Sequence, residues 1–588
     1  MKKRDSAFLI GCVLIHLALG ILLFPGAGTD DCFITYQAVD RLSDTGRIEN
    51  LNGQSVEISS SLSHVLVLAI LKVPLPWSTF WIGLVVSVLC GAVVIVSTWW
   101  ISMLVFDLSE VAKTATLGAA LHGPLLYWSW SGMETTFSAV WFTVLVGLAI
   151  RFVRCAKVAN KMAWRSSFVV AGISVFLARP EGFVIVGVTL SFMLVFSVMM
   201  SKFDRMKTIH AWGPTIGAVG VIAIAVTMWR WLTFERLLPN PVYAKTSGIT
   251  IEKIVRGATY AFESITTPPM LVLFALPILA VVFAWIHRHV PGRGQGGAMS
   301  RAGSWWNDHP IWDGPLTLVG ACIATYGATV VAAGGDWMPH GRFTIHILPL
   351  MLCLGSGAIW RVLRSFSPRE RRFSVGLVLV LVVTVSVADS TWVSPVRERR
   401  CLWNLDIRPE EPFTVAFQRL NAGNRRDTEL LLPVLRPAAR RIIEEKGSVC
   451  LLTGQMGMIP YALYQEFGDQ VQFIDRRGLT EADLTRFNDL PRHQWGLGIG
   501  FEDVAEGVIA TDRQDDMGRA VRHIWDREPD IVYGLWFRPS RFGETARVFA
   551  ERGFRVTQFT AVRSIFPERE TFGEHVFVLE AGIPSPPP

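Results

Sequence analysis

Two adjacent carboxylates, Asp30 and Asp31, follow directly after the first long apolar stretch of the sequence. Carboxylates at membrane depth are costly unless they are paired, hydrated or functional. Because neighbouring aspartates repel each other, one of them is expected to bind a proton more tightly and to serve as a base near neutral pH. Such a base would take the proton from a sugar hydroxyl that attacks an anomeric carbon. In the alternative interpretation, the aspartates cap the start of a surface helix.

Three basic residues, Arg179, Lys245 and Arg342, lie in other polar clusters at the ends of apolar stretches. Cations of this kind stabilise a departing phosphate, because negative charge develops on its oxygens as a sugar–phosphate bond breaks. Each of them could instead pair with a nearby carboxylate or with a lipid headgroup. We expect these residues to form a donor phosphate site, and ion pairing is the alternative.

The same clusters contain side chains that could bind sugar or acceptor hydroxyls, or could only brace loops. These candidates are Glu57, Glu134, Glu181, Asp336, Tyr243 and His340. The sequence has no Cys-x-x-Cys motif and no His/Cys cluster, so we do not expect a zinc site. A divalent cation at Asp30 and Asp31 stays open, and no other cofactor is expected.

The elements that must position these residues are apolar spans of transmembrane length. Of the 588 residues, 51% are hydrophobic and 18% are charged, which is too apolar a composition for a soluble enzyme. The hydropathy pattern predicts an α-helical polytopic membrane protein with eleven spans. They cover residues 8–24, 79–105, 112–128, 134–152, 167–180, 182–200, 211–231, 269–287, 314–334, 343–363 and 373–391. The fifth and sixth spans meet at Pro180, which predicts a tight hairpin.

Loop charge predicts the orientation of these spans. If the basic N-terminus is cytoplasmic, the inner loops and helix ends hold 20 of the 30 Lys and Arg in residues 1–390. The odd number of spans then places residues 392–588 on the outer face, together with every polar cluster described above. Residues 25–78 form the first outer loop. In an alternative interpretation, residues 8–24 are the core of a cleaved signal peptide.

Residues 392–588 have a different pattern. Apolar runs of strand length at 449–452, 471–474, 531–535 and 576–579 alternate with helical stretches, which is typical of a small α/β domain. Residues 453–457 resemble a phosphate-binding turn, but they lack the lysine of a P-loop and are interpreted as a tight turn. The sequence therefore predicts a membrane domain at 1–391 and an outer α/β domain at 392–588.

The net charge of +7 does not indicate a nucleic-acid partner. Residues 391–588 hold 26 Lys and Arg against 29 Asp and Glu, so the basic excess belongs to the membrane part of the chain. There it is explained by the inner loops.

Taken in order, the polar clusters resemble bacterial GT-C membrane glycosyltransferases that use polyprenyl-phosphate sugars. The sequence is most similar to the group that contains the actinobacterial terminal arabinofuranosyltransferases. The matching segments are residues 30–36, 52–57, 131–135, 179–182, 239–245 and 334–342, with a weaker match at 457–461.

The resemblance implies a GT-C fold and the transfer of a sugar, with arabinofuranose as one candidate, from a polyprenyl-phosphate donor to an envelope glycan, lipid or protein. Asp30 and Asp31 would be the catalytic site, and Glu57 would shape the first outer loop. The enzyme would lie among the lipids of a bacterial inner (plasma) membrane, with a cytoplasmic N-terminus and an extracytoplasmic C-terminal domain. That domain would hold the acceptor, and no nucleotide would be required.

Two other classes of protein stay open. A transporter or flippase for lipid-linked glycans would also have many spans and buried charges, but repeated halves and broken helices would be expected, and neither is evident in the sequence. A non-catalytic membrane scaffold would display the outer domain, and loss of Asp30 or Asp31 would then change nothing.

Overall fold

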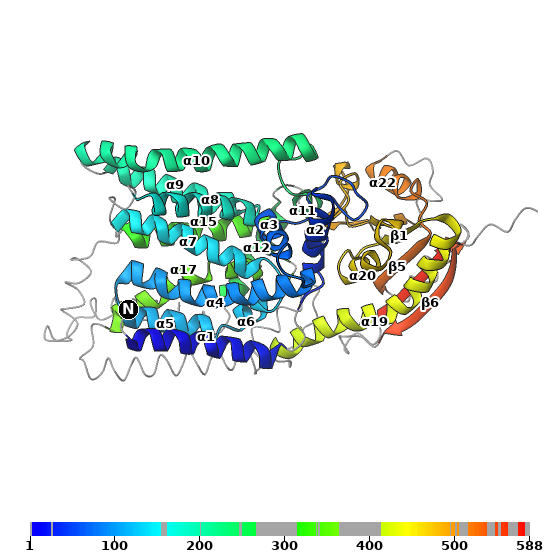
Figure 1. The fold of residues 1–588 in the computed structure, drawn as a ribbon, viewed down its shortest axis with the longest axis horizontal. Coiled ribbons are helices and arrows are strands. Elements are labelled where there is room, and N and C mark those ends of the chain that lie inside the picture. The colour runs from blue at the N-terminus through cyan, green and yellow to red at the C-terminus, as the bar shows by residue number, and fades with distance from the viewer. Residues whose placement is uncertain are drawn as a thin grey trace, which may run out of the picture. The chain divides into compact units, whose positions relative to one another are not determined.

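A computed structural model describes most of the chain, and Figure 1 shows its elements. The described residues are 3–24, 28–154, 161–199, 202–245, 248, 250–265, 314–336, 338, 341–363, 413–493, 496–499, 503–504, 515–537, 547, 549–550, 554–562 and 574–581. The spans predicted at 269–287 and 373–391 lie outside these ranges.

The chain divides into two compact units, each built from segments that are far apart in the sequence. Unit 1 comprises Met1–Pro25, Leu84–Val226 and Ile249–Val415. Unit 2 comprises Gly26–Gly83, Thr227–Gly248 and Ala416–Pro588. The first outer loop therefore belongs to the same compact unit as the C-terminal strands.

Unit 1 is a bundle of helices that run alongside one another (Figure 1). The first residues of α4 and the last residues of α10 belong to unit 2. The helices of unit 1 are α1 (Lys3–Leu23), α4 (Thr79–Phe106), α5 (Ser109–Ala120), α6 (Gly123–Ser129), α7 (Thr135–Arg154), α8 (Met162–Ala178), α9 (Gly182–Met199), α10 (Lys202–Phe234), α12 (Ile251–Ile265), α15 (Gly314–Ala333), α16 (Arg342–Ile345) and α17 (Leu348–Leu363).

Six described helices are long and apolar enough to cross a membrane, namely α1, α4, α7, α9, the Trp212–Phe234 part of α10, and α15. Two shorter apolar helices, α8 and Leu348–Arg361 of α17, accompany them. Large apolar side chains are exposed on these helices, for example Leu22 of α1 at 72% and Leu89 of α4 at 59%. Such exposure is expected where lipid, and not water, surrounds a helix. The chain is a multi-pass membrane protein.

The predicted hairpin between the fifth and sixth spans is confirmed. Helix α8 ends at Ala178, α9 begins at Gly182, and the Gly182 N–H donates to the Arg179 carbonyl oxygen at 2.9 Å. Pro180 cannot continue the first helix, because it lacks an N–H and restricts the preceding residue. A side chain at Gly182 would overlap the Val175 carbonyl, so the close approach of the two helices requires glycine there.

The span predicted at 112–128 is wrong in one respect, because the structure divides it into α5 and α6. The break lies at His122, whose Nδ1 accepts a hydrogen bond from the Leu125 N–H at 3.2 Å and so caps α6. Pro124 in the first turn of α6 explains the break, since proline is tolerated at a helix start but not in a helix interior.

Helix α1 is bound to the rest of unit 1 by polar contacts as well as by packing. Asp5 pairs with Lys113 at 2.9 Å, and the fully buried His16 forms hydrogen bonds with the Ala120 carbonyl at 3.2 Å and the Ser129 hydroxyl at 3.1 Å. Buried polar groups need such partners. These contacts attach α1 to α5 and α6.

Unit 2 contains a five-stranded sheet in the order β2-β1-β5-β7-β6. Strands β1 (Val449–Thr453), β2 (Val471–Asp475) and β5 (Ile531–Phe537) are parallel neighbours, whereas β7 (Glu574–Ala581) pairs antiparallel with β5 and with β6 (Phe554–Val562). The four predicted strands are confirmed as β1, β2, β5 and β7, and β6 was missed. A two-stranded ribbon joins β3 (Arg492–His493) and β4 (Gly496–Leu497).

Helices cover both faces of this sheet (Figure 1). One face packs on α19 (Phe413–Lys446) and α20 (Met458–Phe467), through a core that includes Leu435, Leu451 and Leu463. The other face packs on α22 (Asp516–Trp525), through residues such as Ile524 and Val532. The remaining elements of unit 2 are α2 (Cys32–Thr45), α3 (Leu62–Lys72), α11 (Asn240–Lys245), η3 (Gly468–Gln470) and η4 (Leu484–Arg486).

Two glycines of α1 provide a matched test of its packing. A Cβ at Gly20 would overlap the Trp130 ring, whereas a Cβ at Gly11 would have no heavy atom within 4 Å. We expect Gly20→Ala to destabilise the protein by about 1–3 kcal/mol through overpacking. Gly11→Ala should be neutral or slightly stabilising, because alanine favours helix. The melting temperatures of both variants in detergent are the measurement, and equal shifts would contradict this packing.

Candidate active site

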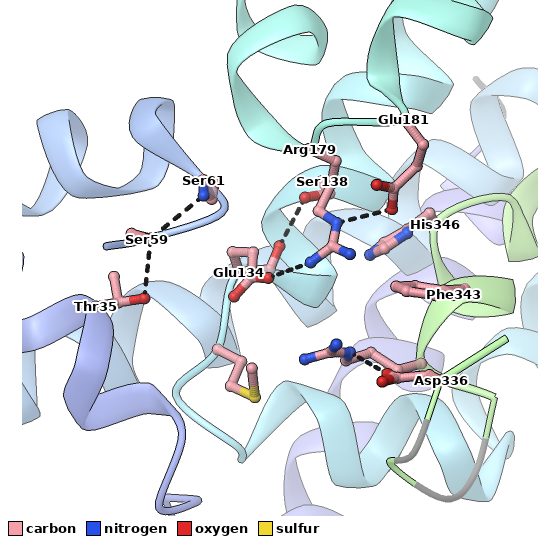
Figure 2. A network of polar contacts seen from close by, with 12 residues as sticks. Thr35, Ser59, Ser61, Glu134, Ser138, Arg179, Glu181, Asp336, Phe343 and His346 are labelled. Carbon is pink, nitrogen blue, oxygen red and sulfur yellow. Dashed lines mark hydrogen bonds and ion pairs between the residues drawn. The ribbon is translucent and has the colours of Figure 1, made fainter. Parts of the chain in front are cut away.

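Three charged side chains of unit 1 form a buried network where two helices meet a turn (Figure 2). Glu134 precedes α7, and Arg179 and Glu181 occupy the α8–α9 turn. Arg179 Nη1 donates to Glu134 Oε1 at 2.6 Å, and Arg179 Nε donates to Glu181 Oε1 at 2.9 Å. The side chains of Arg179 and Glu134 are only 5% and 3% exposed. One guanidinium is therefore compensated by two carboxylates.

A second ion pair lies beside this network. Arg342 Nε is 2.6 Å from Asp336 Oδ2, and both side chains are buried. The guanidinium groups of Arg179 and Arg342 lie 5.0 and 5.5 Å from the centroid of the Phe343 ring. Figure 2 shows Phe343 beside the Arg179 network, next to Asp336. Two arginines thus share one aromatic ring, which is favourable for each cation and fixes their spacing.

Two uncharged polar residues extend the network, and sequence reasoning missed both. The Tyr326 hydroxyl is 2.6 Å from His346 Nδ1 and donates to Glu181 Oε1 at 3.3 Å. Both side chains are fully buried, and His346 Nε2 has no hydrogen-bond partner within the described part of the chain. The available signal was a tyrosine and a histidine inside predicted membrane spans, since polar side chains there are uncommon.

Helix α12 holds the loop that carries Asp336. Arg256 Nε donates to the Gly334 carbonyl at 3.1 Å, and the Tyr260 hydroxyl accepts from the Phe343 N–H at 3.1 Å. Gly335 has a φ of 72°, and a Cβ there would lie 2.6 Å from Tyr260. Both the left-handed backbone and the close approach require glycine. The candidate His340 lies outside the described residues.

In unit 2, Asp30 caps a helix, but not the one that follows it in the chain. The Met458 N–H, at the start of α20, donates to Asp30 Oδ1 at 2.8 Å. Asp31 occupies the N-cap position of α2, and its side chain forms no capping bond there. The 453–457 segment is confirmed as a turn after β1, and the anion at the start of the following helix is the Asp30 carboxylate.

Helix α2 is bound to α20 and to this turn by further side chains that were not predicted. Gln37 Nε2 donates to the Met456 carbonyl at 2.5 Å. Asp40 accepts from the Tyr461 hydroxyl at 2.8 Å and from Gln465 at 2.9 Å. Arg41 donates to the Tyr464 hydroxyl at 2.8 Å and pairs with Asp469 and Glu49. The spacing of residues 37, 40 and 41 places them on one face of a helix, which was the available signal.

The other predicted residues of unit 2 are held in a second cluster. Both carboxylate oxygens of Glu57 accept from Arg230 at 2.7 Å, and both side chains are buried. The Asn240 N–H donates to the Glu57 carbonyl at 3.0 Å. The Tyr243 hydroxyl accepts from the Leu237 N–H at 3.2 Å. Lys245, the last residue of α11, is partly exposed. Glu57 is thus a brace for the first outer loop in this structure.

The structure divides the predicted residues between the two units. Arg179, Arg342, Glu134, Glu181 and Asp336 belong to unit 1, whereas Asp30, Asp31, Glu57, Tyr243 and Lys245 belong to unit 2. A cavity shared by the aspartates and the arginines stays a prediction.

One three-residue group among the described residues has the geometry of a metal site, and it does not include Asp30 or Asp31. The ligand atoms of Glu481, Asp483 and His523 lie within 4.8 Å of one another. Glu481 already pairs with Arg527 at 2.7 Å, and Asp483 lies 3.7 Å from an Arg486 nitrogen. Burial raises the pKa of Glu481 to about 7, although Arg527 opposes this shift. The arginines supply charge compensation without an ion.

No protein-family model matches the sequence, and no curated protein matches it. Among solved structures, the chain is similar to ArnT from Cupriavidus metallidurans bound to undecaprenyl phosphate, with 12% identity, a TM-score of 0.42, and coverage of 97% of this chain and 98% of that chain. It is similar to the apo Archaeoglobus fulgidus oligosaccharyltransferase, with 11% identity, a TM-score of 0.47, and coverage of 95% and 73%. It is also similar to the arabinofuranosyltransferase AftD from mycobacteria, with 14% identity and a TM-score of 0.47. This match covers 99% of this chain and 42% of that chain. At such identities and TM-scores, the function of this chain has to rest on its own residues.

The Arg179 network gives a prediction about stability. Arg179→Met would leave Glu134 and Glu181 buried without their cation, which typically costs about 3–5 kcal/mol. We expect a large drop in the melting temperature, partly reversed in the double variant with Glu134→Gln. The matched control is Arg440→Met, because Arg440 pairs with Glu466 on an exposed surface and should contribute less than about 1 kcal/mol. Similar shifts for the two single variants would show that the network is not a buried charge cluster.

Proposed function

We propose that this chain is a membrane glycosyltransferase that moves a sugar from a polyprenyl-phosphate donor to an acceptor hydroxyl. The observation that carries the proposal is the cluster of two arginines and three carboxylates at the ends of apolar helices, around Phe343. Charged groups at this depth are expensive to bury, so their concentration in one place supports a functional site. A donor with a lipid chain and a phosphate headgroup matches both the lipid-exposed helices and the basic groups.

The ion pairs of Arg179 and Arg342 guide the role that this proposal gives to each of them. Arg179 is held by two carboxylates, and its role in this proposal is to fix Glu134 and Glu181. Arg342 pairs with Asp336 and shares the Phe343 ring with Arg179, and the planar N–H fork of a guanidinium suits the oxygens of a phosphate. Arg342 and Lys245 are therefore the proposed ligands of the departing phosphate, and their positive charge would stabilise its developing negative charge.

In the proposed reaction, one carboxylate of the Asp30/Asp31 pair removes the proton of the acceptor hydroxyl as its oxygen attacks the anomeric carbon. The bond from that carbon to the phosphate oxygen breaks, and its electron pair remains on the lipid phosphate. Direct displacement of this kind inverts the anomeric configuration. If a divalent cation binds at the aspartate pair, it would add charge stabilisation there, and assays with and without chelator would report it.

Several finer assignments belong to this proposal and follow from the resemblance of the ordered segments. The sugar is proposed to be arabinofuranose, and the acceptor an envelope glycan, lipid or protein on the outer face of a bacterial inner membrane. Glu134, Glu181 and Asp336 would orient sugar hydroxyls while they stay paired with arginine, since each carboxylate has more than one acceptor site. Tyr243 would contribute to the acceptor side.

A transporter or flippase is the second candidate, and the break between α5 and α6 is the observation that favours it, because transporters use interrupted helices. The two functions differ in their products. A flippase would move a lipid-linked sugar across a liposome membrane without consuming it, whereas a glycosyltransferase would release the lipid phosphate.

The aspartate pair can be tested by substitution. Asp31→Asn should lower turnover with polyprenyl-phosphate sugars by about 100- to 10,000-fold, as expected for loss of a general base. Asp44→Asn is the matched control, because Asp44 is an exposed aspartate on the same helix, α2. Release of lipid phosphate by the purified proteins in nanodiscs is the measurement, and melting temperatures check the fold. Full turnover in both Asp31→Asn and Asp30→Asn would remove the catalytic assignment.

The phosphate role of Arg342 gives a separate prediction. Arg342→Gln should lower kcat/KM for the donor by about 100- to 1,000-fold, because a cation at the leaving group would be lost. Arg342→Lys should recover part of this loss, since it retains the charge but not the bidentate fork. The exposed Arg440→Gln is the control for charge removal. Normal donor kinetics in Arg342→Gln would contradict the assignment.

A further inference from the structure

Helix α2, which directly follows the aspartate pair, is attached to the α/β sheet through α20. Contacts run along α2 from its start to its last turns: Asp30 to the Met458 N–H, Gln37 to the Met456 carbonyl, Asp40 to Tyr461 and Gln465, and Arg41 to Tyr464. The Phe33 and Tyr461 rings add an apolar contact, with centroids 5.3 Å apart. The first outer loop is therefore structurally continuous with the C-terminal part of the chain.

The contact between Asp30 and the Met458 N–H supplies the cap that α20 lacks. Its N-cap residue is Gly457, which has no side chain to accept a hydrogen bond from the first turn. Helix starts leave N–H groups without partners and carry a partial positive charge, so a carboxylate there is favourable. Asp30 supplies this carboxylate from a position 428 residues earlier. A Cβ at Gly457 would overlap the Asp30 carboxylate, so the glycine is required for the contact.

The same contact distinguishes Asp30 from Asp31. Asp31 has a helical backbone, with φ −64° and ψ −23°, at the start of α2. Successive side chains in such a backbone point about 100° apart around the axis. The Asp30 side chain is directed to α20, whereas the side chain of Asp31 makes no capping bond at the start of α2.

We propose that Asp30 is a positioning residue that acts through the N-terminus of α20, and that Asp31 is the base. This rests on the proposed function and assigns different roles to the two members of the pair. Asp30 fixes the start of α2 on the α/β sheet, and this sets the direction of Asp31. Gly457 and Met458, at the start of α20, thereby support the catalytic site, although they supply no group that touches the substrate.

The conservative variant of Asp30 is the sharpest test. In Asp30→Asn the side-chain oxygen can still accept the Met458 N–H, whereas Asp30→Ala has no acceptor. We expect Asp30→Asn to lower kcat by no more than about fivefold and Asp30→Ala by about 10- to 100-fold, with KM for the donor nearly unchanged in both, because misplacement of a catalytic group acts on the chemical step. The acidic limb of the kcat–pH profile should persist in Asp30→Asn and be lost in Asp31→Asn.

A variant in the α/β domain tests the same contact from the other side. Gly457→Ala should displace Asp30 and reproduce the kcat loss of Asp30→Ala. The matched control is Gln455→Ala in the same turn, because no hydrogen bond of the Gln455 side chain occurs among the residues described, and it should retain wild-type kcat. Hydrogen exchange of peptides covering 456–461, measured by mass spectrometry, should be faster in Asp30→Ala and Gly457→Ala than in Asp30→Asn.

The outcomes separate this proposal from the proposed function. If Asp30→Asn is as inactive as Asp30→Ala while its exchange is unchanged, Asp30 has a chemical role and the positioning role is wrong, although glycosyl transfer stands. Full kcat in Asp30→Ala or Gly457→Ala would also overturn it. If the wild-type protein transfers no sugar from any polyprenyl-phosphate donor, the proposed function fails, and the exchange measurements still decide whether Asp30 holds α20.

Discussion

The structure depends on one constraint, the high cost of a charge that is removed from water without a partner. The chain places arginines and carboxylates at the ends of apolar helices, and the structure pairs them. Arg179 is held by two carboxylates, Arg342 by one, and Arg230 by both oxygens of Glu57. The pairs of Arg179 with Glu134 and of Arg230 with Glu57 join segments that are distant in the sequence, and the planar guanidinium restricts how these segments meet. Charge compensation therefore determines which helix ends and loops lie together.

The same constraint explains why polar side chains that could bind a substrate also have a structural role. A polar side chain at a helix end was open to two explanations from the sequence, a ligand for sugar or phosphate and a brace for a loop. The contacts of Glu57 and Arg179 favour bracing, since both oxygens of Glu57 bind Arg230 and Arg179 binds two carboxylates. Arg342 pairs with Asp336, next to the glycine-rich loop held by α12.

In unit 2 the same constraint applies to the partial positive charge at the N-terminus of α20. The start of α20 has a glycine where α6 and α22 have a capping side chain, and Asp30 fills that role from the first outer loop. A carboxylate that the sequence singled out as a candidate base thus has a structural partner in this helix start. The α/β domain is consequently more than a separate module for an acceptor, because part of its fold is completed by residues next to the first span.

The sequence by itself determined the elements that depend on local pattern. Apolar length predicted the membrane helices, Pro180 predicted the α8–α9 turn, and four of the five strands of the large sheet were recognised from short apolar runs. Gly123 and Pro124 also signalled the break between α5 and α6, although it was overlooked. Only the tertiary structure decided the partners: Arg230 for Glu57, and Met458 for Asp30. These two pairs join positions that are 173 and 428 residues apart, and many carboxylates could satisfy a given cation. Packing alone selects which of them come within hydrogen-bonding distance.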